Sequence, residues 1–126
     1  MGERLMATKI GPDELADTDS QPGILREEAF AKPGLWAGRS TTEPGVTSGW
    51  HHHGQADTIV YVLSGTVVIE FGEGADAVKA GEGEFLLIPS GLVHRESTPS
   101  DGPSRSVVIR TGGDGPPTFD VDGPNG

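Results

Sequence analysis

Turn signals divide this chain into short segments, and that division limits the folds the chain can adopt. Of its 126 residues, 20 are glycine and 10 are proline. The segments between the turns are rich in β-branched and aromatic residues, as in residues 58–63 and 66–71. No helical period persists along the chain, and no internal repeat of roughly 20–50 residues is visible. Short strands at close, regular spacing indicate an all-β sandwich or barrel.

The length predicts one domain, with a flanking segment at each end. Residues 1–23 form an irregular polar lead, residues 24–111 the β domain, and residues 112–126 a tail rich in glycine and proline, in which residues 118–121 could add a short strand or pack over the barrel mouth. The Ser64-Gly65 turn predicts a hairpin between the strands that flank it. The expected strands are residues 24–30, 35–41, the segment through the histidines at 51–53, 58–63, 66–71, 75–79, 85–88, 93–98 and 106–110.

Three of the four histidines are consecutive, at residues 51–53, and lie between two strand-like segments. Side chains alternate faces along a strand, so His51 and His53 point the same way and His52 points to the opposite face. Asp57 follows four residues after His53. Imidazole and carboxylate together suit iron, manganese, nickel, copper and zinc. A histidine triplet can also be a solvated loop or a purification tag, but a tag would lie at a terminus. Between two strand-like segments, the pattern predicts a metal site.

The fourth histidine follows an apolar strand and a turn. Residues 85–88 are apolar, and Pro89-Ser90-Gly91 comes directly after them. Proline cannot continue a central strand, and Gly91 can adopt the positive φ that a turn requires. The turn sends the chain back across its neighbour. His94 can therefore arrive beside His51 and His53.

Two ordered patterns resemble the two motifs of the cupin superfamily. The first is Gly45, five residues, His51-x-His53, three residues, Asp57 and then Gly65. The second is Gly83, five residues, Pro89-x-Gly91, two residues and His94. The chain thus resembles small single-domain cupins over roughly residues 35–111. The resemblance implies a jelly-roll β-barrel that holds one divalent metal ion per chain and receives a small molecule.

The carboxylate ligand is the point at which the chain departs from that pattern. The family usually has glutamate there, and Asp57 is one methylene shorter. Counting back the usual seven positions from Gly65 leads to Thr58, whose hydroxyl is a poor ligand. The family also tolerates three instead of four residues after the second histidine, and that shorter spacing leads to Asp57. The predicted metal ligands are therefore His51, His53, Asp57 and His94. Fe(II) or Mn(II) is favoured, and Ni(II), Zn(II) and Cu(II) are alternatives.

Candidate catalytic residues are Glu96 and Tyr61. Glu96 lies two residues after His94 on the same strand face, where it could orient a ligand or act as a general base. Tyr61 is one of the aromatic residues that could wall an apolar pocket. Arg39 and Arg110 lie among strand residues. An inward arginine could clamp a carboxylate, but a surface position is expected for both.

Composition narrows the function classes. The net charge of −10 disfavours nucleic acid and anionic membranes as partners, and the absence of cysteine excludes disulfides and thiolate ligands. No Gly-x-Ser-x-Gly elbow is present. The lead lacks the apolar core of a signal peptide and no segment has membrane-spanning length, so a cytoplasmic location is expected.

Three functional hypotheses fit these residues. The first is a metal-dependent enzyme acting on a small oxygen-rich molecule, with dioxygenase chemistry slightly ahead of isomerase, lyase or cyclase chemistry. The second is a non-catalytic module that binds a small ligand. The third is a metal-free barrel in which the histidines act as acids and bases. We also expect a homodimer in which residues 24–30 cover a sheet edge.

Overall fold

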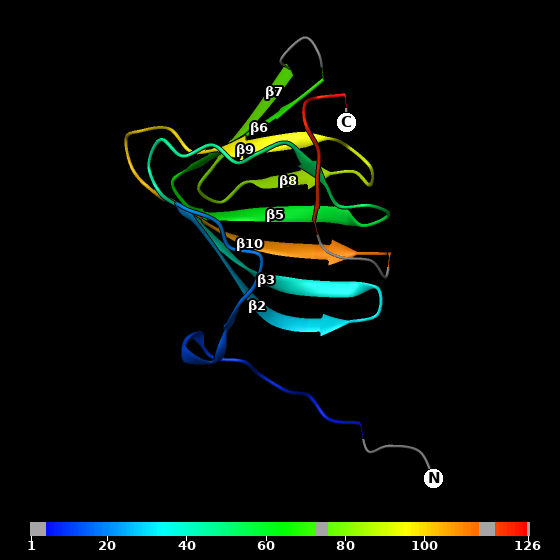
Figure 1. The fold of residues 1–126 in the computed structure, drawn as a ribbon. Coiled ribbons are helices and arrows are strands. Elements are labelled where there is room, and N and C mark those ends of the chain that lie inside the picture. The colour runs from blue at the N-terminus through cyan, green and yellow to red at the C-terminus, as the bar shows by residue number, and fades with distance from the viewer. Residues whose placement is uncertain (1–4, 73–75, 114–117, 126) are drawn as a thin grey trace.

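The computed structural model describes residues 5–72, 76–113 and 118–125, and it is formed almost wholly by two antiparallel sheets (Figure 1). The first sheet has the order β1 (Ala16–Asp17), β2 (Ile24–Lys32), β3 (Leu35–Thr42), β10 (Ser104–Thr111), β5 (Asp57–Ser64) and β8 (Phe85–Ile88). The second has the order β11 (Phe119–Asp120), β4 (His51–His52), β9 (His94–Ser97), β6 (Thr66–Phe71) and β7 (Asp76–Gly81). This architecture confirms the predicted jelly-roll barrel. No helix in these ranges is long and apolar enough to cross a membrane.

The core lies where the inner faces of the two sheets meet. Along β5 the residues alternate strictly, so Thr58, Val60 and Val62 are buried and their neighbours are more exposed. Val67 and Ile69 of β6 pack against Val60 and Val62 from the other sheet. Each such aliphatic side chain contributes about 1.5–3 kcal/mol when it is fully buried. The aliphatic core thus fixes which residues of each strand point into the barrel.

The predicted hairpin at Gly65 is wrong. Strand β5 pairs with β8 and β10, whereas β6 pairs with β7 and β9 in the other sheet. Gly65 has a φ of +78°, and a Cβ atom at this position would lie 2.2 Å from the carbonyl oxygen of Pro103. Only glycine fits this close approach without displacing the backbone. The chain therefore crosses from one sheet to the other at Gly65.

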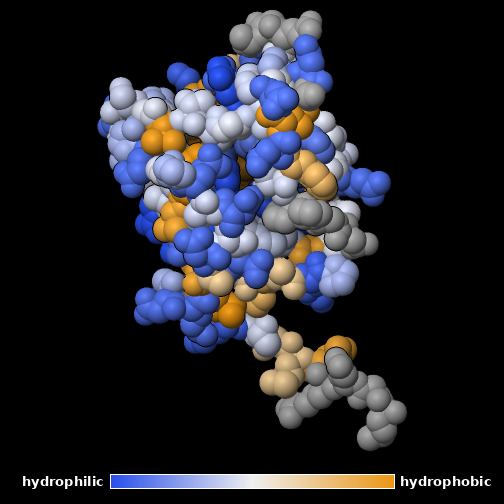
Figure 2. Space-filling view, in the orientation of Figure 1, coloured by the Kyte–Doolittle hydropathy of each residue, from blue (hydrophilic) through white to orange (hydrophobic). Residues whose placement is uncertain are grey.

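Both ends of the chain add elements to the barrel. Within the lead, which was predicted to be irregular, a 3₁₀ helix at Pro12–Glu14 precedes β1, and β1 pairs with β2. Residues 5–10 extend away from the barrel, with Leu5 and Met6 exposed (Figures 1 and 2). In the tail, β11 pairs with β4. The tail thus forms a short strand, which is one of the two possibilities that the sequence left open for residues 118–121. The first residue of the predicted strand 75–79 lies outside the described residues, and β7 begins at Asp76.

Candidate metal centre

Three histidines meet inside the barrel. His51 in β4 pairs directly with His94 in β9, and His53 follows β4 by one residue. One ring nitrogen of each histidine lies within 4.8 Å of those of the other two. All three residues are buried, and their exposed fractions are between 1% and 6%. The two predicted motifs therefore place His51, His53 and His94 together, and we call this group the three-histidine centre.

His52 lies on the opposite face, as strand alternation predicts. Its ring stacks on Phe119 of β11 with 5.0 Å between the ring centroids and an angle of 9° between the planes. Its Nδ1 accepts a hydrogen bond from the backbone N–H of Gly54. His52 therefore anchors the C-terminal tail over β4 and takes no part in the three-histidine centre.

Backbone carbonyls orient two of the three imidazoles. His51 Nδ1 lies 2.8 Å from the carbonyl oxygen of Gly49, and His94 Nδ1 lies 2.9 Å from that of Leu92. A carbonyl can only accept a hydrogen bond, so each Nδ1 carries the proton and each Nε2 keeps its lone pair. Metal-ligating histidines are commonly held in this way. The donor set therefore fits a divalent transition metal.

Burial also keeps the imidazoles neutral. Removal from water, and then the nearby His51, lower the pKa of His94 to about 4. Burial likewise lowers the pKa of His51, although the negative charge of Glu96 partly opposes this effect. Both rings are therefore uncharged at neutral pH, and no proton has to leave before a metal ion binds.

Asp57, the predicted carboxylate ligand, lies outside this centre. It is exposed at the start of β5, and its Oδ1 accepts a 2.8 Å hydrogen bond from the backbone N–H of Ser90. The next residue, Thr58, is 1% exposed and borders the cavity beside the histidines. Because side chains alternate along a strand, only one of these two neighbours can face inward. The inward residue is Thr58, the position reached by counting back seven residues from Gly65.

Glu96 supplies the carboxylate that lies beside the histidines. Its Oε1 accepts a 2.6 Å hydrogen bond from Arg26 Nη2, and Arg26 Nη1 donates to the carbonyl oxygen of Asp19. Burial alone would raise the pKa of Glu96, but Arg26 and the histidines outweigh it and lower the pKa. Glu96 is thus a partly buried anion with a fixed partner. Sequence reasoning placed Glu96 near the site but missed Arg26. The available signal was its position two residues after the buried Ile24, on the same face of β2.

Tyr61, the second candidate catalytic residue, does not reach the cavity. It lies on the outward side of β5, where its ring centroid is 4.7 Å from that of Phe85. Neither residue borders the cavities around the histidines. Its position follows from the same alternation that turns Asp57 outward.

The two arginines have different positions, although a surface position was expected for both. Arg39 is partly exposed and pairs with Glu27 at 3.1 Å. Arg110 instead points into the barrel, where it is 8% exposed and its guanidinium lies 4.8 Å from the ring centroid of Trp36. Burial, and then the positive charge of Arg26, lower the pKa of Arg110 to about 10. The expectation was therefore wrong for Arg110, which is a cation of the cavity wall.

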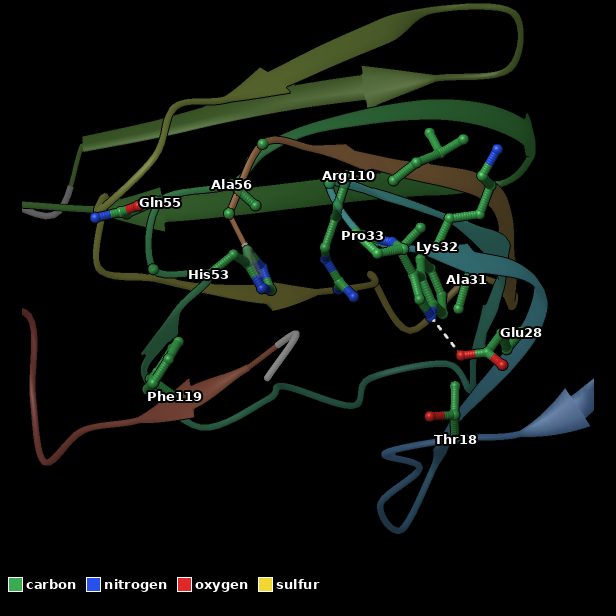
Figure 3. Close-up of a pocket in the computed structure, with 16 residues that line it drawn as sticks. Thr18, Glu28, Ala31, Lys32, Pro33, His53, Gln55, Ala56, Arg110 and Phe119 are labelled. Atoms are coloured by element: carbon green, nitrogen blue, oxygen red, sulfur yellow. Dashed lines mark hydrogen bonds between the residues drawn. The ribbon is translucent and has the colours of Figure 1, made fainter. Parts of the chain in front are cut away.

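A large pocket reaches His53 of the three-histidine centre (Figure 3). It has a volume of about 910 Å³, and its walls come from the β2–β3 turn, the segment after His53 and the tail at Phe119. A smaller inner space of about 20 Å³ is bounded by the histidines, Thr58 and Glu96. His53, Arg110 and Trp36 border both spaces. A ligand in the large pocket can therefore reach the histidines.

Comparison with known proteins agrees with this architecture. An uncharacterized protein, YdbB from Bacillus subtilis, is 47% identical over 46 residues, which cover 36% of this chain and 40% of that protein. The polyketide cyclase RemF from Streptomyces resistomycificus has a similar structure, with a TM-score of 0.75 and 17% identity over 92% of this chain and 86% of that one. KdgF from Halomonas sp. has a TM-score of 0.69 and 20% identity, covering 84% of this chain and 94% of that one. The structural likenesses concern the fold.

The family assignment rests on a longer match. The family model described as the cupin domain matches residues 38–110, which is more than half of the chain. The matched segment contains all three members of the three-histidine centre. The chain belongs to the cupin domain family.

Proposed function

We propose that this chain is a metal-dependent enzyme that acts on a small, oxygen-rich organic anion. The observation that carries the proposal is the convergence of three buried imidazoles beside a pocket of about 910 Å³. One divalent ion per chain, with Fe(II) or Mn(II) favoured over Ni(II), Zn(II) and Cu(II), would be held by His51, His53 and His94. When bound, the ion supplies Lewis-acid polarisation of a substrate oxygen and, if it is iron, access to dioxygen chemistry.

The charges of the cavity wall support an anionic substrate. Arg26 and Glu96 neutralise each other at 2.6 Å. Arg110 lies beside this pair and adds a positive charge to the wall. The imidazoles of His51 and His94 are neutral and add none, so these groups give the wall a positive charge before any metal ion binds. Low effective dielectric strengthens the attraction of such a wall for an anion.

The donor set bears on the reaction type. Two histidines and one carboxylate are characteristic of the non-haem iron oxygenases, and Asp57 faces away from the cavity here. We therefore place isomerase, lyase or cyclase chemistry ahead of the dioxygenase chemistry that the sequence slightly favoured. The likeness to the polyketide cyclase RemF is compatible with this order. Glu96 would hold its negative charge near His51 and His94, and its lowered pKa makes it a weak general base.

The test is turnover of hydroxy acids, dicarbonyls and phenols by protein loaded separately with Fe(II), Mn(II), Ni(II) or Zn(II). Each assay is run in air and under argon. Undiminished turnover under argon supports Lewis-acid chemistry, and turnover that consumes oxygen in step with substrate restores the dioxygenase hypothesis. Tight binding of one compound without turnover by any metal form would assign the chain to the binding class instead.

A further inference from the structure

Two buried donors without partners face each other across neighbouring strands. Thr58 of β5 pairs in register with Arg110 of β10, so their side chains lie on the same inner face. They are 1% and 8% exposed, and among the described residues Thr58 Oγ1 and Arg110 Nε have no hydrogen-bond partner. Native proteins rarely leave such groups unsatisfied. Both residues border the same inner space as the three-histidine centre, so a bound molecule can supply the missing acceptor.

The neighbouring charges leave Arg110 available for a ligand. Glu96 is the carboxylate of the inner space, and it is already paired with Arg26. No ion pair of Arg110 occurs within the described part of the chain. The stacking of its guanidinium on Trp36 holds the group in one plane. Its pKa of about 10, lowered by burial and by Arg26, keeps it protonated at neutral pH.

We propose that Arg110 and Thr58 bind the carboxylate of a small 2-hydroxy or 2-oxo acid beside the three-histidine centre. This inference rests on the proposed function, because it assigns the substrate class of the same cavity. The guanidinium and the hydroxyl donate to the carboxylate, whose 2-oxygen lies on the side of the histidines. The remainder of the acid extends into the pocket of about 910 Å³, which Arg110 also borders (Figure 3).

The shape of the inner space favours a carboxylate over a phosphate. Its volume of about 20 Å³ is close to the room needed by one water-sized group. A flat carboxylate can insert one oxygen there and present its other oxygen to the guanidinium, which matches carboxylate geometry through paired N–H groups. A phosphate can also present two oxygens to a guanidinium. Its phosphorus carries two further oxygens, for which the inner space has no room, so it would have to remain in the outer pocket.

The test measures binding of lactate to the zinc-loaded protein by calorimetry. The neutral lactamide and inorganic phosphate serve as comparison ligands. We expect Arg110→Gln to weaken lactate binding by about tenfold or more, and Thr58→Val by about two- to tenfold, from the strengths of charged and neutral hydrogen bonds. Lactamide should bind more weakly to the parent and be insensitive to Arg110→Gln. Arg105→Gln, which removes an exposed arginine of the same strand β10, is the matched control and should bind lactate like the parent.

Zinc content is measured in every variant, so that failure of the metal site is seen separately. A parent that binds no zinc contradicts the proposed function. In that case lactate binding to the metal-free protein tests the carboxylate site. Unchanged lactate affinity in both folded variants overturns the carboxylate site, as does a parent that shows no lactate binding. Tighter, Arg110-dependent binding of phosphate overturns the choice of ligand. If Arg110→Gln does not fold, lactate binding is measured on Arg110→Lys and Thr58→Val instead. Arg110→Lys keeps the positive charge but lacks the paired N–H groups of the guanidinium, so it should also bind lactate more weakly than the parent.

Discussion

Strand β5 presents two faces whose residues are neighbours in sequence but have different roles. The inward face carries Thr58 at the cavity, followed by Val60 and Val62 in the core. The outward face carries Asp57 and Tyr61, which contact a turn and an aromatic ring outside the barrel. Because the side-chain period is two, a shift of one residue exchanges the two faces completely. The phase of the strand, more than the type of residue, therefore decides which side chains of β5 reach the cavity.

The largest effect should come from the inner side, at the three-histidine centre. We expect His94→Ala to lower metal affinity by at least about a hundredfold, because loss of a ligand exceeds the 10–100-fold cost of losing a group that only orients one. Elemental analysis of the purified variant measures the occupancy. His52→Ala is the matched control, since His52 stacks on Phe119 outside the centre. Full occupancy after substitution of each member of the centre would refute the metal site.

The second prediction concerns how the stability of the metal-free protein depends on pH. His94 has a pKa of about 4 in the folded chain against an ordinary value of 6.5, so the unfolded chain binds a proton first as the pH falls. The stability that this difference contributes is present above pH 6.5 and is lost as the pH falls towards 4. At about 1.4 kcal/mol per pKa unit, the metal-free protein should lose about 2 kcal/mol between pH 7 and pH 5.

Urea unfolding of the metal-free protein at these two pH values measures that loss. His94→Asn removes the titrating group, so its stability should depend less on pH over the same interval. An equal loss in the parent and the variant would show that other groups cause the acid sensitivity.

The outward face gives a third prediction, for the expected homodimer. Phe85 and Leu87 of the edge strand β8 are 71% and 66% exposed, and Ile59 of β5 lies beside them on the same face. A second copy that covers this face would bury it. We expect Phe85→Lys to weaken dimerisation by about 2 kcal/mol or more if it lies at the centre of the interface. Light scattering over a concentration series measures the change.

Leu25→Lys is the matched control for that experiment. Leu25 is an exposed apolar residue of the segment 24–30, which the sequence analysis assigned to the dimer contact. Dissociation caused by Leu25→Lys, with no effect of Phe85→Lys, would favour that segment over the β8 edge. A parent that is monomeric at high micromolar concentration would contradict the dimer altogether.

The strand pattern and the histidines could be predicted from sequence because their signals are local. Turn residues mark the ends of most strands, and two spaced motifs identify the three-histidine centre. The connection at Gly65 could not be read locally, because the turn residues of a hairpin and of a crossing between sheets look alike. The difference lies in a distant contact, the carbonyl oxygen of Pro103.

The inward cations were missed for a related reason. Lone arginines are usually at the surface, and only the tertiary environment reveals that Arg26 is balanced by Glu96, a residue 70 positions away. For Arg110, the sequence analysis considered an inward position as an alternative to the surface. Its stacking on Trp36 could not be predicted, because it depends on the pairing of β3 with β10. Burial of a charge is decided by which partners the fold brings together, and that information is not local.

The smallest expected effect comes from substituting Asp57 and Thr58, the two neighbours at the start of β5. Asp57→Ala should leave metal affinity unchanged, because Asp57 faces the turn at Ser90 rather than the histidines. It should lower the free energy of unfolding by about 1 kcal/mol through loss of that hydrogen bond. Thr58→Ala removes the inward hydroxyl and should leave that turn intact. Metal titration and urea unfolding of the two variants measure both quantities. A metal affinity reduced by Asp57→Ala but not by Thr58→Ala would mean that the strand turns its other face to the ion, and the inward assignment of Thr58 would be wrong.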